Sequence, residues 1–152
     1  MRNLLAALAL IALCAGPSAA ADVRQEVMAS VNRFVEGFNK GDVEAALAVY
    51  TDDMVILDEF PPHVWQGAGA GAAWFHDYDA DAKQKAITDG VVTLAKARHI
   101  DVDGDHAYVV VPANYLFKKQ GKPVKEIGSV LTLSLQKGEA GWKLNGWAWA
   151  KN

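Results

Sequence analysis

The sequence predicts one α+β domain in which helices come first and an antiparallel sheet follows. Apolar residues recur at helical spacing in the first half of the chain, and the composition becomes β-like from Ile87 onward. Polar turns at 101–105, 120–123 and 137–141 then separate long apolar runs, as hairpins do. Chains with this order of elements gather their helices on one face of the sheet.

The first 21 residues are typical of a secretory signal peptide. Residues 1–3 give a positively charged start, residues 4–15 form an apolar run, and small residues in 17–21 suit cleavage after Ala20 or Ala21. We therefore expect an exported protein, periplasmic or secreted, whose mature part is one domain.

Two other interpretations of this segment fit less well. The apolar run is shorter than the roughly 20 residues that cross a bilayer, and the bulky Leu13 is a poor neighbour for a lipid-modified Cys14. We expect the mature domain, residues 22–152, to have no membrane attachment.

Composition excludes several kinds of site in that mature domain. Cys14 is the only cysteine, so the mature domain has no disulfide, no thiol nucleophile and no thiolate metal site. The chain carries 15 basic and 18 acidic residues; without Arg2 the balance is 14 to 18, a net charge of −4. This acidic balance argues against nucleic acid or an anionic membrane as a partner.

Two helices are expected before the sheet. The first spans residues 23–39 and turns one apolar face inward, made by Val23, Val27, Val31, Phe34, Val35 and Phe38. Gly41 suits the end of that helix because it adopts positive φ without strain, and Asp42 suits the N-cap of the next. The second helix has apolar residues at helical spacing up to Tyr50.

A short strand, a loop and a third helix follow. Residues 51–53 have turn chemistry, residues 54–57 form an apolar strand, and a loop runs from Pro61 to Gly67. The third helix is expected at 70–83. The glycines of 67–71 lack the lysine and hydroxyl residue of a phosphate loop, so we expect them to allow close packing under this helix.

The sheet half contains four expected strands, at 91–100, 106–117, 124–136 and 142–150. Strict alternation places Trp142 and Leu144 on one face of the last strand, and Trp147 and Trp149 on the other. A sheet covered by helices on one side only should be polar on its other side. The apolar residues on both faces therefore predict a second cover, most simply a homodimer through the sheet.

The pattern Asn39-Lys40-Gly41-Asp42, short helix, Tyr50-Thr51-Asp52-Asp53, strand, Asp58 resembles the nuclear transport factor 2-like superfamily. This superfamily includes SnoaL-like cyclases and ketosteroid isomerases, and the likeness is most specific over residues 31–75. It implies a cystatin-like cone, in which the helices and a curved sheet enclose an apolar pocket. Many relatives pair through the sheet.

Several polar and aromatic residues are candidates for the mouth of that pocket. By resemblance, Asp58 stands where ketosteroid isomerases place their proton-transferring aspartate. The tyrosine that those enzymes carry on the first helix falls on Phe34, and this loss of an oxyanion donor argues against steroid isomerisation. The candidate ligand-binding residues are His63, Trp65, Trp74, Tyr78, Asn114 and Tyr115, with Glu59 and Glu126 nearby.

No metal or cofactor is expected, since His63, His76, His99 and His106 lack the spacing of metal ligands. The first functional hypothesis is binding of a small, partly apolar molecule in the pocket. The second is a cofactor-free acid/base enzyme of the isomerase, cyclase or dehydratase type, with Asp58 as base and His63 or Tyr115 as helper. The third is a ligand-free interaction module that works through the sheet.

Overall fold

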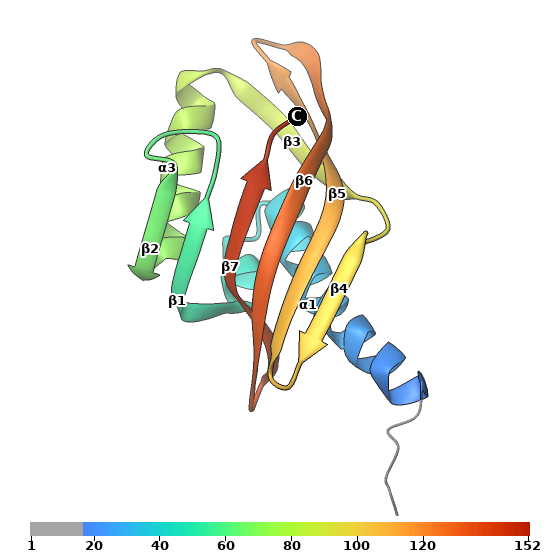
Figure 1. Cartoon of the computed structure of the whole chain (residues 1–152). Helices are drawn as coiled ribbons and strands as arrows, with labels where there is room; N and C mark the ends of the chain where they lie inside the picture. Colours follow the sequence, from blue (N-terminus) through green and yellow to red (C-terminus); the bar gives the residue numbers. More distant parts are fainter. Residues whose placement is uncertain (1–16) are drawn as a thin grey trace, which may run out of the picture.

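A curved sheet forms one layer of the fold, and the helices form the other (Figure 1). The computed structural model describes residues 17–152. Within them, the helices are α1 (Pro17–Lys40), α2 (Val43–Leu47) and α3 (Ala70–Gln84). The strands are β1 (Tyr50–Leu57), β2 (Val64–Ala68), β3 (Ile87–Leu94), β4 (His99–Asp103), β5 (His106–Lys119), β6 (Lys122–Gly138) and β7 (Gly141–Ala150).

The strand order brings the ends of β1 and β7 together. Within residues 17–152 the order is β2-β1-β7-β6-β5-β3, with β4 also paired to β5; β1 and β7 run parallel, and the other pairs are antiparallel. Leu57 of β1 lies beside Ala148 of β7. Because parallel strands end at the same edge of a sheet, the residues after β1 and the residues after β7 lie next to each other.

Helix α1 packs on the sheet with the predicted apolar face. Val27, Val31, Phe34 and Val35 are buried. The buried Ser30 Oγ donates a hydrogen bond of 2.7 Å to the carbonyl oxygen of Trp142 on β7. The helix begins before its predicted start, inside the predicted signal segment. The rest of that segment, residues 1–16, lies outside the described residues, and its cleavage stays a prediction.

The start of β1 differs from the prediction. Gly41 has φ +67° and the Asp42 side chain caps α2 by accepting from the Ala45 amide, as expected. However, α2 ends at Leu47, and β1 already begins at Tyr50, so the predicted turn at 51–53 is wrong. Pairing with β2 and β7 outweighs the turn preference of these short polar residues.

The sheet also has more strands than predicted. The expected strand at 91–100 is two strands, β3 and β4, which both pair with the 14-residue β5. The expected loop up to Gly67 contains the edge strand β2. The three predicted hairpins, from β4 through β7, are confirmed, with Gly104 and Gly121 at positive φ in two of the turns.

A β-bulge corrects the predicted faces of β7. Leu135 pairs with Leu144 and Ser134 pairs with Gly146, so Asn145 is an extra residue. The extra residue reverses the alternation. Trp147 and Trp149 therefore lie on the same inner side as Trp142, instead of on the opposite face.

Close packing explains the small residues before α3, as predicted. A Cβ atom on Gly71 would lie 2.5 Å from the Tyr50 ring and 3.0 Å from Leu47. Residues 67–71 therefore bring α3 against β1 and α2. Over residues 17–152, the helices are too short or too polar to span a bilayer.

Candidate functional site

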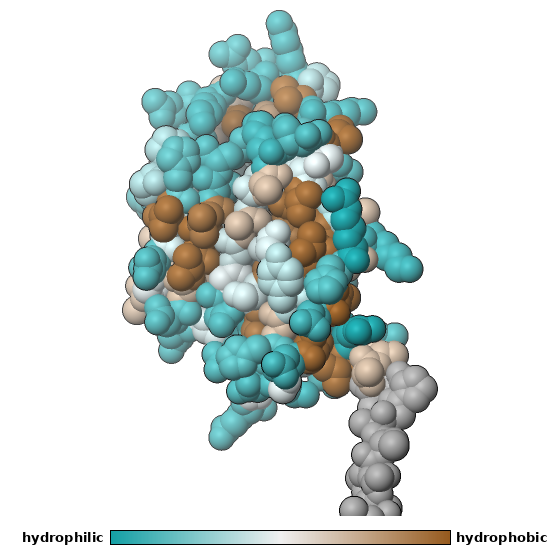
Figure 2. Space-filling model, in the orientation of Figure 1, coloured by the Kyte–Doolittle hydropathy of each residue, from teal (hydrophilic) through white to brown (hydrophobic). Residues whose placement is uncertain are grey.

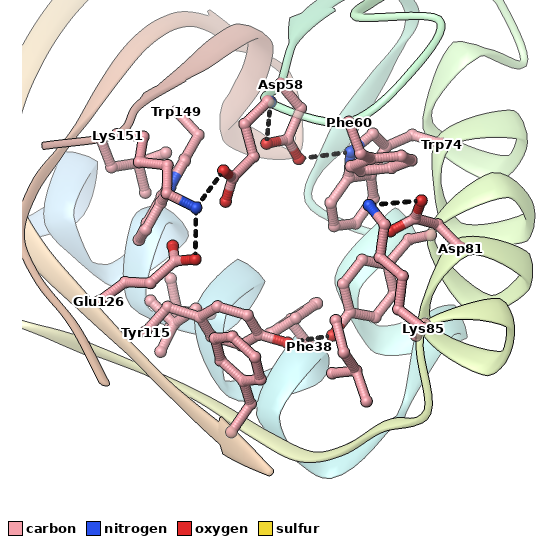
Figure 3. A pocket seen from close by; sticks show the side chains of 18 of the residues that line it. Phe38, Asp58, Phe60, Trp74, Asp81, Lys85, Tyr115, Glu126, Trp149 and Lys151 are labelled. Carbon is pink, nitrogen blue, oxygen red and sulfur yellow. Dashed lines mark hydrogen bonds and ion pairs between the residues drawn. The ribbon is translucent and has the colours of Figure 1, made fainter. Parts of the chain in front are cut away.

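The helices and the sheet enclose a cavity of about 230 Å³. It opens beside the ends of β1 and β7, and residues from α1, α3, β5 and β6 complete its wall (Figure 3). Its lining residues are Phe34, Val35, Phe38, Asp58, Glu59, Phe60, Trp74, Tyr78, Asp81, Ala82, Lys85, Ile87, Val92, Tyr115, Phe117, Lys119, Glu126, Leu131, Trp147, Trp149 and Lys151.

Nine of the residues that line the cavity are aromatic, and many of their rings contact one another. Trp74 stacks on Tyr78 with ring centroids 5.4 Å apart and meets Trp147 edge-on at 5.0 Å. Phe38 meets Tyr78 edge-on at 5.1 Å, and Phe60 lies 6.1 Å from the same ring. Because each ring contacts others, the wall holds its shape without a ligand.

Asp58 is a polar group in this aromatic wall. It directly follows β1, which sets its position beside the end of β7. Its Oδ1 accepts from the Glu59 amide at 2.7 Å, and its Oδ2 accepts from Trp74 Nε1 at 2.8 Å. Burial raises the pKa of this carboxyl from 3.8 to about 6, and the two hydrogen bonds only partly oppose that rise. Asp58 can therefore gain or lose a proton close to neutral pH.

Two tyrosine hydroxyls meet in the cavity wall. Tyr78 Oη and Tyr115 Oη are 2.6 Å apart, with one donating to the other. Burial raises the pKa of both side chains, so both hydroxyls are neutral. One of the two hydroxyl protons forms the hydrogen bond between the tyrosines. The other hydroxyl proton can therefore be donated to a bound molecule.

Charged residues from three separate segments meet at the mouth. Lys151 Nζ lies 2.6 Å from Glu59 and 2.6 Å from Glu126 on β6. Burial raises the pKa of Glu126. Glu126 Oε2 is buried and has no hydrogen-bond partner within residues 17–152. This oxygen can accept a hydrogen bond from a ligand.

The structure brings four of the seven sequence-predicted site residues together. Asp58, Trp74, Tyr78 and Tyr115 line the cavity. The other three lie elsewhere.

His63 is exposed, and its Nδ1 lies 3.1 Å from the backbone oxygen of Asp58. Trp65 packs in the core against Phe60, with its indole N–H donating to Asp77. Asn114 accepts from the Gly128 amide and belongs to the opposite side of β5 from Tyr115. The expectation that these three line the pocket is therefore wrong.

Sequence reasoning missed other parts of the wall. Phe60, Trp149 and Lys151 line the cavity but were not among the candidates. Asp81 on α3 and Lys85 just after it also line the cavity, where they form an ion pair of 2.8 Å. For the part of the wall that α3 forms, the sequence offered one signal, which is the helical spacing of Tyr78, Asp81 and Lys85. Over the described part of the chain, no group of three His, Cys, Asp or Glu residues could hold a metal ion.

Comparisons with known proteins agree with this architecture. Residues 31–134 match the SnoaL-like domain family. No curated protein is significantly similar in sequence. The structure is similar to a variant of Rv3472 from Mycobacterium tuberculosis, with 17% identity, TM-score 0.72, and coverage of 90% of this chain and 76% of that one.

Two further solved structures share the fold. One is an NTF2-like protein with a cystatin-like fold from Novosphingobium aromaticivorans, with 17% identity, TM-score 0.69 and coverage of 90% of each chain. The other is a ketosteroid isomerase-like protein from Erwinia carotovora atroseptica, with 18% identity, TM-score 0.63, and coverage of 84% of this chain and 94% of that one. These likenesses confirm the predicted cystatin-like α+β fold.

Proposed function

The chain belongs to the SnoaL-like domain family, and we propose that its cavity binds a small, partly apolar molecule. The supporting observation is an open cavity of about 230 Å³ whose aromatic walls converge on Asp58. Ligand sites are typically concave and apolar, with a few polar groups that orient the ligand, and drug-sized ligands occupy roughly 300–1,000 Å³. The smaller volume here suits a molecule of one or two rings.

A matched pair of variants on α3 tests this proposal. Ala82 lines the cavity, whereas Ala80 is exposed on the same helix and does not. A thermal-shift screen of small aromatic molecules, starting with indole, should find compounds that raise the Tm of the wild-type protein. Ala82→Phe fills the cavity and should abolish that rise, while Ala80→Phe should keep it. Equal responses from the two variants would place the binding elsewhere.

A second candidate function is cofactor-free acid/base catalysis. It is favoured by the pKa of about 6 at Asp58, because a general base works best near the operating pH. Phe34 lines the cavity without a hydroxyl, so the Tyr78–Tyr115 pair would have to supply the donor to a developing oxyanion. This function requires turnover that collapses in Asp58→Asn while the fold persists. Unchanged turnover in that variant would contradict it.

We also propose that the protein pairs through the outer face of its sheet. Three exposed apolar residues there are Val64, Leu57 and Val55, with exposed fractions of 50%, 47% and 39%, and Tyr108 on β5 is 47% exposed. Figure 2 shows apolar atoms gathered over β1 and β2 and again over β5. Monomeric soluble proteins seldom leave large apolar patches uncovered.

Sedimentation of the purified protein tests this pairing. The wild type should sediment as a dimer, and Leu57→Glu should weaken the dimer. Val43→Glu is the control, because Val43 is 40% exposed on α2 and lies off the sheet. A wild-type protein that stays monomeric at high concentration would contradict the proposal.

Export is proposed from the first 21 residues, and N-terminal sequencing of the protein from the producing cell would test cleavage.

A further inference from the structure

We propose that the molecule bound in the cavity carries a positively charged amine, placed between Asp58 and Glu126 and against the aromatic wall. This inference rests on the proposed binding function and adds the chemical class of the ligand. It follows from the charges around the polar end of the cavity, from an unused acceptor there, and from the rings that surround it.

The polar end of the cavity has more carboxylates than cations. Asp58, Glu59 and Glu126 meet one lysine, Lys151, whose Nζ contacts the two glutamates at 2.6 Å each. The hydrogen bonds to Asp58 come from the Glu59 amide and from the Trp74 indole, and both donors are neutral. The charged groups that act on Asp58 are Glu59 and Glu126, and both repel its ionised form.

The cations of the opposite wall do not change this balance. Lys85 pairs with Asp81 at 2.8 Å, so this pair adds no net charge. Lys119 also lines the cavity, but it is exposed at the end of β5, beside the turn to β6. Asp58 comes instead from the loop after β1. An anionic ligand would have to compete with two glutamates for Lys151.

An ammonium group would supply the hydrogen-bond donor that a buried oxygen of Glu126 lacks. Glu126 Oε2 is buried without a hydrogen-bond partner within the described residues. Leaving a buried acceptor unpaired is costly, and a carboxylate gains most from a charged donor. An ammonium has three N–H donors and no acceptor, so it can donate to more than one carboxylate at the same time.

The cavity wall also suits a cation. Trp74, Tyr115 and Trp149 line the same cavity as Asp58 and Glu126, and these two acids come from different segments of the chain (Figure 3). Tryptophan and tyrosine faces attract a cation through the negative potential of their π systems. The same rings can stack on the apolar part of the ligand.

Three probes with one ring system test the charge preference. Tryptamine, tryptophol and indole-3-acetate carry an ammonium, a hydroxyl and a carboxylate on the same indole. Isothermal titration calorimetry with the purified protein at pH 7.5 should give a Kd for tryptamine about tenfold lower than for tryptophol, as expected for a charge-assisted pair. Indole-3-acetate should bind most weakly.

Variants and pH identify the group responsible. Asp58→Asn should remove most of the preference for tryptamine. Asp53→Asn should keep it, because Asp53 is exposed on β1, the strand just before Asp58, and does not line the cavity. With a pKa of about 6 at Asp58, lowering the pH from 7.5 to 5 protonates roughly nine in ten of these carboxyls and should weaken tryptamine about tenfold. Tryptophol should change little.

Other titratable groups surround Asp58 and require a control. They are Tyr50 on β1, Glu59 and His63 in the following loop, Tyr78 on α3, Tyr115 on β5, Glu126 on β6 and Lys151 after β7. His63→Gln should keep the pH dependence of tryptamine binding. If His63→Gln abolishes it while Asp58→Asn keeps it, the assignment to Asp58 is wrong.

The outcomes separate this inference from the proposed function. If tryptophol or indole-3-acetate binds the wild type at least as tightly as tryptamine, the ligand is not an amine and the inference is wrong. The proposed binding function then stands, provided that Ala82→Phe abolishes that binding. If none of the three indoles binds and the thermal-shift screen also finds no ligand, the amine inference and the proposed binding function are both wrong.

Discussion

Replacing Asp58 by asparagine should make the stability of the protein less sensitive to pH. The wild-type carboxyl has its pKa raised by burial from 3.8 to about 6. Between these values the folded state binds more protons than the unfolded state. The stability that comes from the protonated carboxyl is therefore full below pH 3.8 and is lost as the pH rises through 6.

The size of this loss follows from the shift. One pKa unit corresponds to about 1.4 kcal/mol, so a rise of about two units makes ionised Asp58 cost roughly 3 kcal/mol above pH 6. Asparagine cannot ionise. It also replaces one of the two oxygens that accept from the Glu59 amide and the Trp74 indole, which costs ~1–3 kcal/mol at every pH.

The assay is urea unfolding of both proteins from pH 4 to pH 8. The free energy of unfolding of Asp58→Asn, minus that of the wild type, should increase by ~2–3 kcal/mol between pH 4 and pH 7.5. Asp53→Asn is the matched control and should show no such increase. A difference between Asp58→Asn and wild type that does not change with pH would show that the Asp58 carboxyl is not desolvated, and the acid/base argument would fail with it.

Four further substitutions test the packing and hydrogen bonding in and around the cavity. Trp74→Phe keeps a ring but removes the N–H that lies 2.8 Å from Asp58 Oδ2; the pKa of Asp58 should rise further, as followed by carboxyl-carbon NMR. Tyr115→Phe leaves the Tyr78 hydroxyl without its partner and should cost ~1–2 kcal/mol in urea unfolding; adding Tyr78→Phe should cost less than additivity predicts. Gly71→Ala places a Cβ 2.5 Å from a buried tyrosine ring and should destabilise by ~1–3 kcal/mol, lowering the Tm; an unchanged Tm would contradict that packing.

Local signals in the sequence predicted most of the fold. The helical spacing in α1, the Gly41 and Asp42 boundary, and the Asp-Gly and Gln-Gly turns all act over a few residues, so they can be recognised without the partner segments. The strand β2 could not be recognised in this way. Residues 64–68 are Val, Trp, Gln, Gly and Ala, too short and irregular a pattern to indicate a strand, and they form one because β1 pairs with them.

The candidate site was predicted less completely for the same physical reason. Asp58 was found from the resemblance to ketosteroid isomerases, which a short motif before it carries, but Lys151 joins the site only because β7 runs parallel to β1. Trp65 and Trp74 look alike as sequence. One packs in the core beside Phe60 and the other lines the cavity, and nothing local to either residue distinguishes them.

Two irregularities in the sheet decide what the cavity contains. The bulge at Asn145 turns Trp147 and Trp149 to the inner side, where regular alternation would have turned them outward. In β6, Ser129 pairs with Ala113 and Glu126 pairs with Tyr115, so the stretch around Gly128, at φ +86°, shifts the alternation as well.

Without that shift, the inner position would belong to Ile127, which is instead 55% exposed. An apolar residue at that inner position would leave Lys151 with Glu59 alone and the cavity with Asp58 as its only acid near Tyr115. The bulge in β6 therefore supplies the third carboxylate at the polar end of the cavity, and it raises the excess of acids over lysines there from one to two. Because a bulge is set by pairing with the neighbouring strand and not by a short motif, the chemistry of the pocket follows from the topology of the sheet.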